Sequence, residues 1–131
     1  MSIHAAITEQ PARRAVIYAR VASTVRRDHA AFEQQLDACR AEAQRLGAVV
    51  MREFTDLGCS NTTVSGPGLN AARRYITRHP VHYLICHDIT RISRHRPFVV
   101  TTTQHLREHG TRLAPVQHHH DDACAQEGAL S

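Results

Sequence analysis

The stretch that decides the fold is AVIYARVAST, residues 15–24. Its first five residues form a short apolar run of the kind that makes a buried strand. Arg20 closes this run, and the hydroxyl residues Ser23 and Thr24 follow shortly after it. We therefore expect Arg20 and Ser23 near the end of a strand, where functional side chains gather in α/β proteins.

Outward from this strand, apolar patterns of helical and strand type alternate along the chain. Gly47 and Gly110 are typical stops after a helix, and Pro80 ends another. The alternation predicts right-handed βαβ crossovers and hence a three-layer α/β domain, with a mostly parallel central sheet of about four strands and helices on both faces. The predicted helices cover residues 30–46, 69–79 and about 97–109, and the further strands cover residues 48–54, 81–87 and 111–116.

Three segments follow the ends of predicted strands. They are residues 20–24, the polar stretch TDLGCSNTTVSGPG (55–68) and residues 88–94. The middle stretch is rich in turn-forming residues and has no periodicity, which predicts a long loop. Because the carboxyl ends of parallel strands share one edge of a sheet, we expect the three segments to converge there.

The chain of 131 residues suits a single domain. We expect residues 1–12 to form a flexible N-terminal segment, 13–116 the α/β domain, and 117–131 a disordered tail. The tail gathers His118–His120 with two aspartates and Cys124, residue types that bind metals. Neighbouring side chains in a flexible segment point apart, so we predict no defined metal site there.

Composition places the chain among ordinary globular proteins with a mild basic excess. The formal net charge is +4, and all 16 basic residues are arginine. Guanidinium groups suit phosphate recognition, and so a nucleic-acid partner, although a preference for arginine codons gives the same count.

No apolar run approaches the ~20 residues of a membrane span. The first dozen residues lack the pattern of a signal peptide, so we expect a cytoplasmic protein with no membrane partner. The four cysteines show no CxxC spacing and are expected to be free thiols.

Arg91 and Arg94, in the segment TRISR, are candidates for an anion site. They are three residues apart and would share one face of a helix. Together with Arg20 they would form a clamp that stabilises negative charge on a phosphoryl group. The alternative is that they are solvated arginines on a helix surface.

Five segments in order resemble the catalytic domain of serine recombinases, the resolvase/invertase family. They are IYARV followed by a serine, FEQQLDACRAEAQRLG, EFTDLGCS, GPGL and RISR, and the similarity runs from about Arg14 to Val116. The resemblance implies a serine that attacks a DNA phosphodiester and becomes linked to the 5′ phosphate, with no metal or nucleotide cofactor. By position it assigns phosphate clamping to Arg20, Arg91 and Arg94, and positioning to Gln35.

The sequence departs from the family pattern at several positions. The family usually reads arginine-valine-serine, whereas Ala22 stands before Ser23 here, so either Ala22 replaces the nucleophile or Ser23 acts after a one-residue insertion. Gly66 stands where the family commonly has an arginine before PGL, and Thr90 stands where it has an aspartate. Arg73 or Arg74 is a conceivable substitute phosphate ligand, and both are candidate DNA-binding residues.

Family members normally continue into a long dimerisation helix and a DNA-binding domain, and this sequence stops after the fourth predicted strand and a short tail. We therefore expect weak DNA binding by the chain alone and impaired or partner-dependent cleavage, as a homodimer or in association with a full-length recombinase. The alternative is a catalytically inactive dimerisation or regulatory module.

Overall fold

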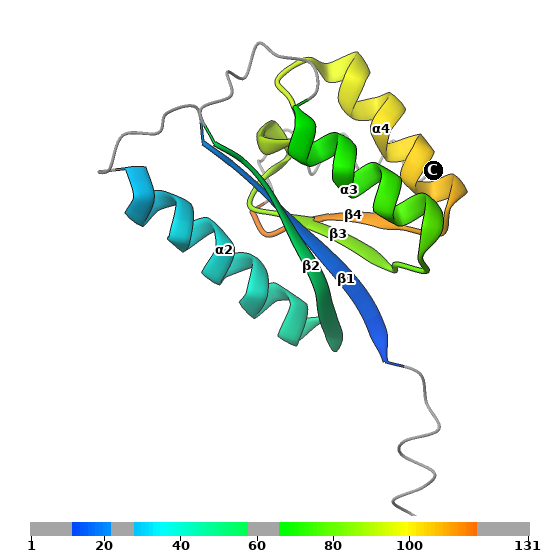
Figure 1. Ribbon diagram of the computed structural model, residues 1–131, viewed down its shortest axis with the longest axis horizontal. Coiled ribbons are helices and arrows are strands. Elements are labelled where there is room, and N and C mark those ends of the chain that lie inside the picture. Colours follow the sequence, from blue (N-terminus) through cyan, green and yellow to red (C-terminus); the bar gives the residue numbers. More distant parts are fainter. Residues whose placement is uncertain (1–11, 22–27, 58–65, 118–131) are drawn as a thin grey trace, which may run out of the picture.

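The computed structural model describes residues 12–21, 28–57 and 66–117. These residues form four strands, three α-helices and one short 3₁₀ helix (Figure 1). The strands are β1 (Arg13–Val21), β2 (Ala48–Leu57), β3 (Tyr83–Cys86) and β4 (Arg112–Pro115). The helices are α2 (Asp28–Arg45), α3 (Pro67–Arg78), η1 (Ile89–Arg91) and α4 (Arg96–Glu108).

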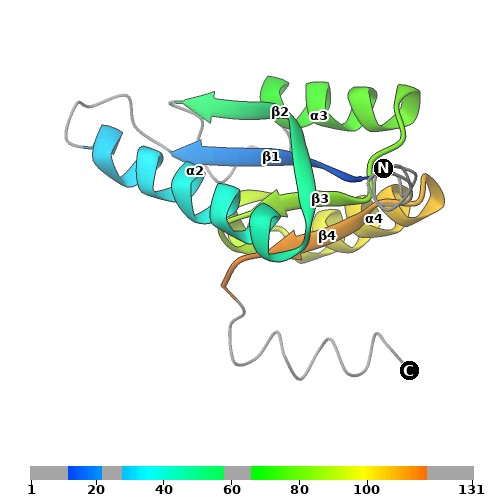
Figure 2. The ribbon, with the colours of Figure 1, turned by 90° about the horizontal axis from the view of Figure 1, so that it is seen from below.

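The strands form one parallel sheet in the order β2-β1-β3-β4. Helix α2 covers one face of the sheet, and α3 and α4 cover the other (Figures 1 and 2). Parallel neighbours need crossover helices, and each helix here supplies one crossover. The predicted three-layer α/β class, with about four parallel strands, is confirmed.

Strand β1 supplies the centre of both apolar layers because its side chains alternate between the two faces of the sheet. Val16 and Tyr18 pack with α3 and α4. Ile17 and Ala19 pack with α2, against a cluster that includes Phe32. All four β1 residues are fully buried, which explains the unbroken apolar run in the sequence.

The predicted helix stops after α2 and α4 are confirmed. Gly47 and Gly110 have φ values of 70° and 79°, in the left-handed region that favours glycine. Strand β2 is longer than predicted and reaches Leu57, because its last residues pair with β1 up to Val21. The predicted loop is therefore shorter at both ends, since α3 begins at Pro67.

Among the described cysteines, Cys39 and Cys86 are free and fully buried. Burial raises the pKa of the Cys39 thiol to about 12, with a further contribution from the carboxylates of Glu42 and Glu53. Burial also raises the pKa of Cys86. Both thiols therefore act as small apolar residues of the core, as predicted, whereas Cys59 and Cys124 lie outside the described residues.

Within the described ranges, no helix combines the length and apolarity that a bilayer crossing requires.

Candidate phosphate site at the carboxyl end of the sheet

Arg20 is the penultimate residue of β1, and its side chain is fully buried. Strand β3 pairs with β1 only as far as Tyr18, so the backbone of Arg20 extends beyond this ladder. The side-chain amide of Gln35, on α2, binds this backbone instead. Its Nε2 donates to the Arg20 carbonyl at 3.1 Å, and its Oε1 accepts from the Arg20 N–H at 3.3 Å. Gln35 thus fixes the end of β1, which is a positioning role.

Arg91 reaches the same backbone from η1. Its Nη1 donates to the Arg20 carbonyl at 3.3 Å. The structure therefore brings together two of the predicted clamp residues, 71 positions apart in sequence. Arg20 lies at the carboxyl end of β1, and Arg91 lies in the segment that follows β3. This contact joins the Arg91 side chain to backbone, so it fixes where the Arg91 guanidinium lies relative to β1.

Asp88 lies beside Arg91 and caps η1. Its carboxylate accepts from the backbone N–H of Thr90 at 2.9 Å and from the Thr90 hydroxyl, which caps η1. Its Oδ2 lies 3.8 Å from Arg91 Nε and 3.3 Å from His87 Nδ1. Burial alone would raise the pKa of the Asp88 carboxyl, but hydrogen bonds from Thr90 and His87 and the charge of Arg91 lower the pKa overall. Asp88 is therefore a buried carboxylate that forms an ion pair with Arg91, at a distance longer than a hydrogen bond.

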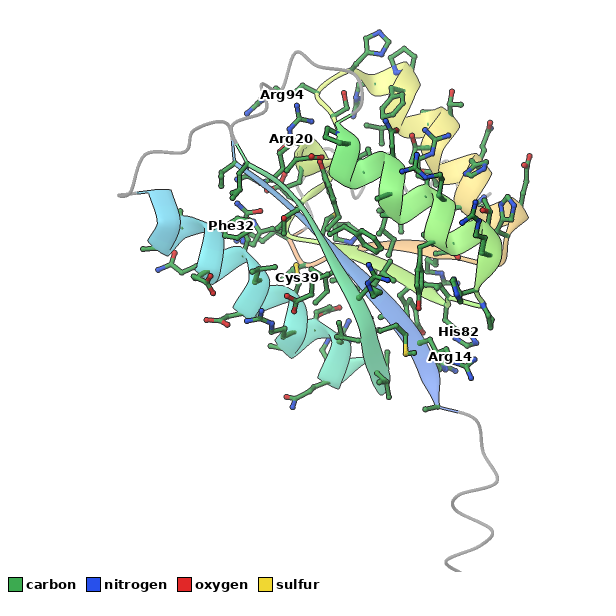
Figure 3. The ribbon with its side chains drawn as sticks, in the orientation of Figure 1. Arg14, Arg20, Phe32, Cys39, His82 and Arg94 are labelled. Atoms are coloured by element: carbon green, nitrogen blue, oxygen red, sulfur yellow. The ribbon has the colours of Figure 1, made fainter. Side chains whose placement is uncertain are left out.

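The prediction that Arg91 and Arg94 share one helical face is wrong. Arg91 ends η1, whereas Arg94 lies in a bend before α4 begins at Arg96. The Ser93 hydroxyl accepts from the N–H of His95 at 2.9 Å, which stabilises a turn in place of a continuous helix. Arg94 is exposed, and Figure 3 shows it at the same end of the sheet as Arg20.

A second buried carboxylate, Asp56 of β2, lies directly across from Arg20 in the β1–β2 register. Its oxygens accept from Tyr18 Oη at 2.6 Å and from the backbone N–H groups of Gly68 at 2.8 Å and Leu69 at 3.2 Å. Helix α3 has no side-chain cap of its own, because its N-cap residue is Gly66. Asp56 therefore caps α3 from a neighbouring strand and joins β1, β2 and α3 at the carboxyl end of the sheet.

The contact with Asp56 explains two glycines of the GPGL segment. A Cβ on Gly66 would lie 2.5 Å from Asp56 Oδ2, and a Cβ on Gly68 would lie 2.3 Å from the backbone oxygen of Thr55. In this packing no side chain fits at position 66, where the serine recombinases commonly carry an arginine.

Arg73 and Arg74 lie on α3, away from the Arg20–Arg91 contact. With Asn70 and Thr77 of the same helix and His105 of α4, they line a hollow between the two helices. The residues that line this hollow do not include Arg20, Arg91 or Arg94.

Ser23 and Ala22 lie outside the described residues, as does the His118–His120 tail. Across residues 12–21, 28–57 and 66–117, no group of three or more histidine, cysteine or acidic residues is arranged to hold a metal ion.

Comparisons with known proteins agree with this architecture. The family model described as "Resolvase, N terminal domain" matches residues 15–130. The chain therefore belongs to the family of resolvase N-terminal domains, the catalytic domains of serine recombinases. A search of curated protein sequences gives no match.

Solved structures share the fold at low identity. The catalytic domain of ISC1926 TnpA, an IS607-like serine recombinase, is 20% identical with a TM-score of 0.71, over 89% of this chain and 79% of that one. The N-terminal catalytic domain of TP901-1 integrase is 19% identical with a TM-score of 0.71, over 79% and 78% of the two chains. A resolvase family site-specific recombinase from Streptococcus pneumoniae is 18% identical with a TM-score of 0.66, over 90% and 86%.

Sequence reasoning missed two residues that organise this end of the sheet. Asp56 falls in the predicted loop and Asp88 in the segment that leads into the third predicted helix, yet both are buried and each accepts several hydrogen bonds. A signal was available, because each is an acidic residue at or just after the end of an apolar strand. Such carboxylates are costly to bury, so a buried one normally holds donors or cations.

Proposed function

We propose that this domain breaks and rejoins DNA strands by serine attack on a phosphodiester. The observation that carries the proposal is the contact between Arg91 and Arg20 at the carboxyl end of β1. It places the Arg91 guanidinium beside the Arg20 backbone, and the family pattern assigns both residues to phosphate binding. Arg20 lies three residues before Ser23 in the sequence.

In this proposal the Ser23 Oγ attacks phosphorus and loses its proton, and the bond from phosphorus to the 3′ oxygen breaks as that oxygen gains a proton. The product is a 5′-phosphoserine link, and reversal of the step rejoins a strand. Negative charge spreads over the phosphoryl oxygens in the transition state. Arg91, beside Asp88, and the exposed Arg94 supply positive charge to these oxygens.

The test is a covalent adduct between protein and supercoiled DNA, detected after denaturation in SDS. We expect the adduct with the unaltered chain and with Thr24→Ala, and its loss in Ser23→Ala. Arg91→Ala should lower the rate of adduct formation by roughly 10²–10³-fold, the usual cost of one transition-state donor. The matched control is Arg112→Ala, which removes an exposed arginine at the opposite, amino-terminal end of β4. A folded protein that forms no adduct, either alone or with a complete serine recombinase present, contradicts the proposal, and so does an adduct that forms equally well in Ser23→Ala.

A second candidate function is an inactive dimerisation or regulatory module. Two observations favour it. Position 66 has no room for the arginine that the family commonly uses, and the Arg20 side chain is fully covered. A phosphate would reach the Arg20 guanidinium only after neighbouring groups move.

This candidate predicts association without cleavage, either of two copies of the chain or of the chain with a complete serine recombinase. Sedimentation at several concentrations, with and without such a recombinase, tests it. A chain that remains monomeric in both experiments excludes this candidate.

A further inference from the structure

The hollow between α3 and α4 is a feature that the proposed cleavage chemistry does not use. Its volume is about 250 Å³, and its lining residues are Asn70, Arg73, Arg74, Thr77 and His105. Each of these side chains can donate a hydrogen bond, and none is acidic. Such a lining suits an anion.

Two buried nitrogen atoms at this hollow lack hydrogen-bond partners within the described part of the chain. They are Nε of Arg73 and Nδ1 of His105. A buried polar atom in this state is destabilising, so native proteins rarely leave one without a water or a ligand. The Arg73 guanidinium carbon lies 5.9 Å from the centre of the Phe98 ring, a contact that holds the group at the hollow. One guanidinium donor and one imidazole nitrogen, both without partners in the described part of the chain, therefore lie between the helices.

The surrounding charges also favour an anion. Burial, the nearby charge of Arg73 and the proximity of His109 lower the pKa of His105, and Glu108 only partly opposes them. Helices α3 and α4 together carry five arginines and one glutamate. Helix α2, on the opposite face, carries four acidic residues and two arginines. The α3–α4 face is thus the basic face of the domain.

We propose that this hollow binds a phosphate group, held by Arg73 and Arg74 with further hydrogen bonds from Asn70, Thr77 and His105. A phosphate presents more oxygens than a carboxylate and can use donors that converge from two helices. None of Arg20, Arg91 and Arg94 is among the residues that line the hollow. Arg73 lies six residues beyond the start of α3, about 9 Å along the helix axis. The identification of this phosphate as part of a DNA backbone rests on the proposed function. The binding of a phosphate group at the hollow does not depend on it.

The first experiment titrates the full chain with inorganic phosphate at constant ionic strength and follows the His105 ring by NMR. We expect a saturable shift of the ring resonances and a rise in the pKa of His105, because a bound anion stabilises the imidazolium. Arg74→Gln should weaken phosphate binding roughly tenfold or more, since Arg74 is exposed and its loss spares the core. The control is Arg45→Gln, which removes the same charge from an exposed side chain on α2. Unchanged His105 resonances in the folded chain, or equal affinities for the unaltered chain and Arg74→Gln, overturn the proposal.

The second experiment identifies the source of the phosphate. Binding of a short DNA duplex is measured over a range of salt concentrations for the same variants and for Ser23→Ala. If the site holds a backbone phosphate, Arg74→Gln reduces the slope of log K against log salt by about 0.9, and Arg45→Gln leaves it unchanged. If the phosphate titration succeeds and this slope is the same in Arg74→Gln, the site binds a free phosphate compound. Loss of the covalent adduct in Ser23→Ala, with both binding readouts intact, separates this site from the cleavage chemistry.

Discussion

Replacement of Asp56 by alanine should remove a large part of the stability of this domain. The substitution leaves the N–H groups of Gly68 and Leu69 without their acceptor at the start of α3, and it removes the hydrogen bond that the buried Tyr18 hydroxyl donates to Asp56. Loss of a helix cap costs about 0.5–2 kcal/mol, and a buried donor without a partner costs about 1–3 kcal/mol. We therefore expect Asp56→Ala to lower the free energy of unfolding by roughly 2–5 kcal/mol, against a total of about 5–15 kcal/mol for a typical domain.

Urea denaturation followed by circular dichroism measures this loss. With an m-value of about 1–3 kcal/mol per molar urea, the midpoint should fall by roughly 1–3 M. Tyr18→Phe removes only one of the three hydrogen bonds and should cost about 1 kcal/mol. The double variant should cost less than the sum of the single variants, because each single variant already removes the hydrogen bond between Tyr18 and Asp56 and the double variant loses it only once. A loss below about 1 kcal/mol in Asp56→Ala, or strict additivity in the double variant, would refute this account of the cap.

Three other predictions follow from the structure. Gln35→Ala should lower the free energy of unfolding, measured by urea denaturation, by about 1–3 kcal/mol, because two hydrogen bonds to the end of β1 are lost. The same substitution at the neighbouring, exposed Gln34 should have little effect. Folding lowers the pKa of His105 below its ordinary value of 6.5, so at low pH the unfolded chain binds more protons than the folded one and the free energy of unfolding falls as pH falls. His105→Asn should reduce this loss of stability between pH 7 and 5. An identical loss in the variant and the unaltered chain would contradict the reasoning. Cys39 and Cys86 should resist iodoacetamide in the folded protein and react in urea, as read by peptide mass spectrometry, and rapid labelling of either in the native state would contradict their burial.

The sequence predicted the fold because the fold depends on local and periodic signals. The apolar run of β1, the helical spacing from Phe32 to Leu46 and the glycines at 47 and 110 each indicate one element without knowledge of the others. Alternation of these elements then leaves few allowed topologies, because parallel strands require crossovers of one hand. The five ordered segments that resemble serine recombinases are likewise visible in the sequence alone.

The candidate site was only partly predictable, because its contacts join residues far apart in the chain. The sequence places Arg20 and Arg91 after strands, but only the folded chain shows that Arg91 donates to the Arg20 carbonyl and that Gln35 binds the same backbone. The separation of Arg91 from Arg94 was also beyond the sequence, because a cap from Asp88 and a turn at Ser93 compete locally with a continuous helix.

The spacing of apolar residues along the sequence thus determined which segments are strands and helices, and hence the three-layer class. The ordered motifs determined the family. Tertiary structure alone decided which polar groups are buried together. Asp56 caps a helix that begins eleven residues later, and Gly66 is small because that carboxylate occupies the space beside it. The physical reason is that the spacing of apolar residues indicates which face of a helix or strand is buried. The partner of a buried carboxylate, in contrast, depends on which hydrogen-bond donors the packed elements bring within hydrogen-bonding distance of it.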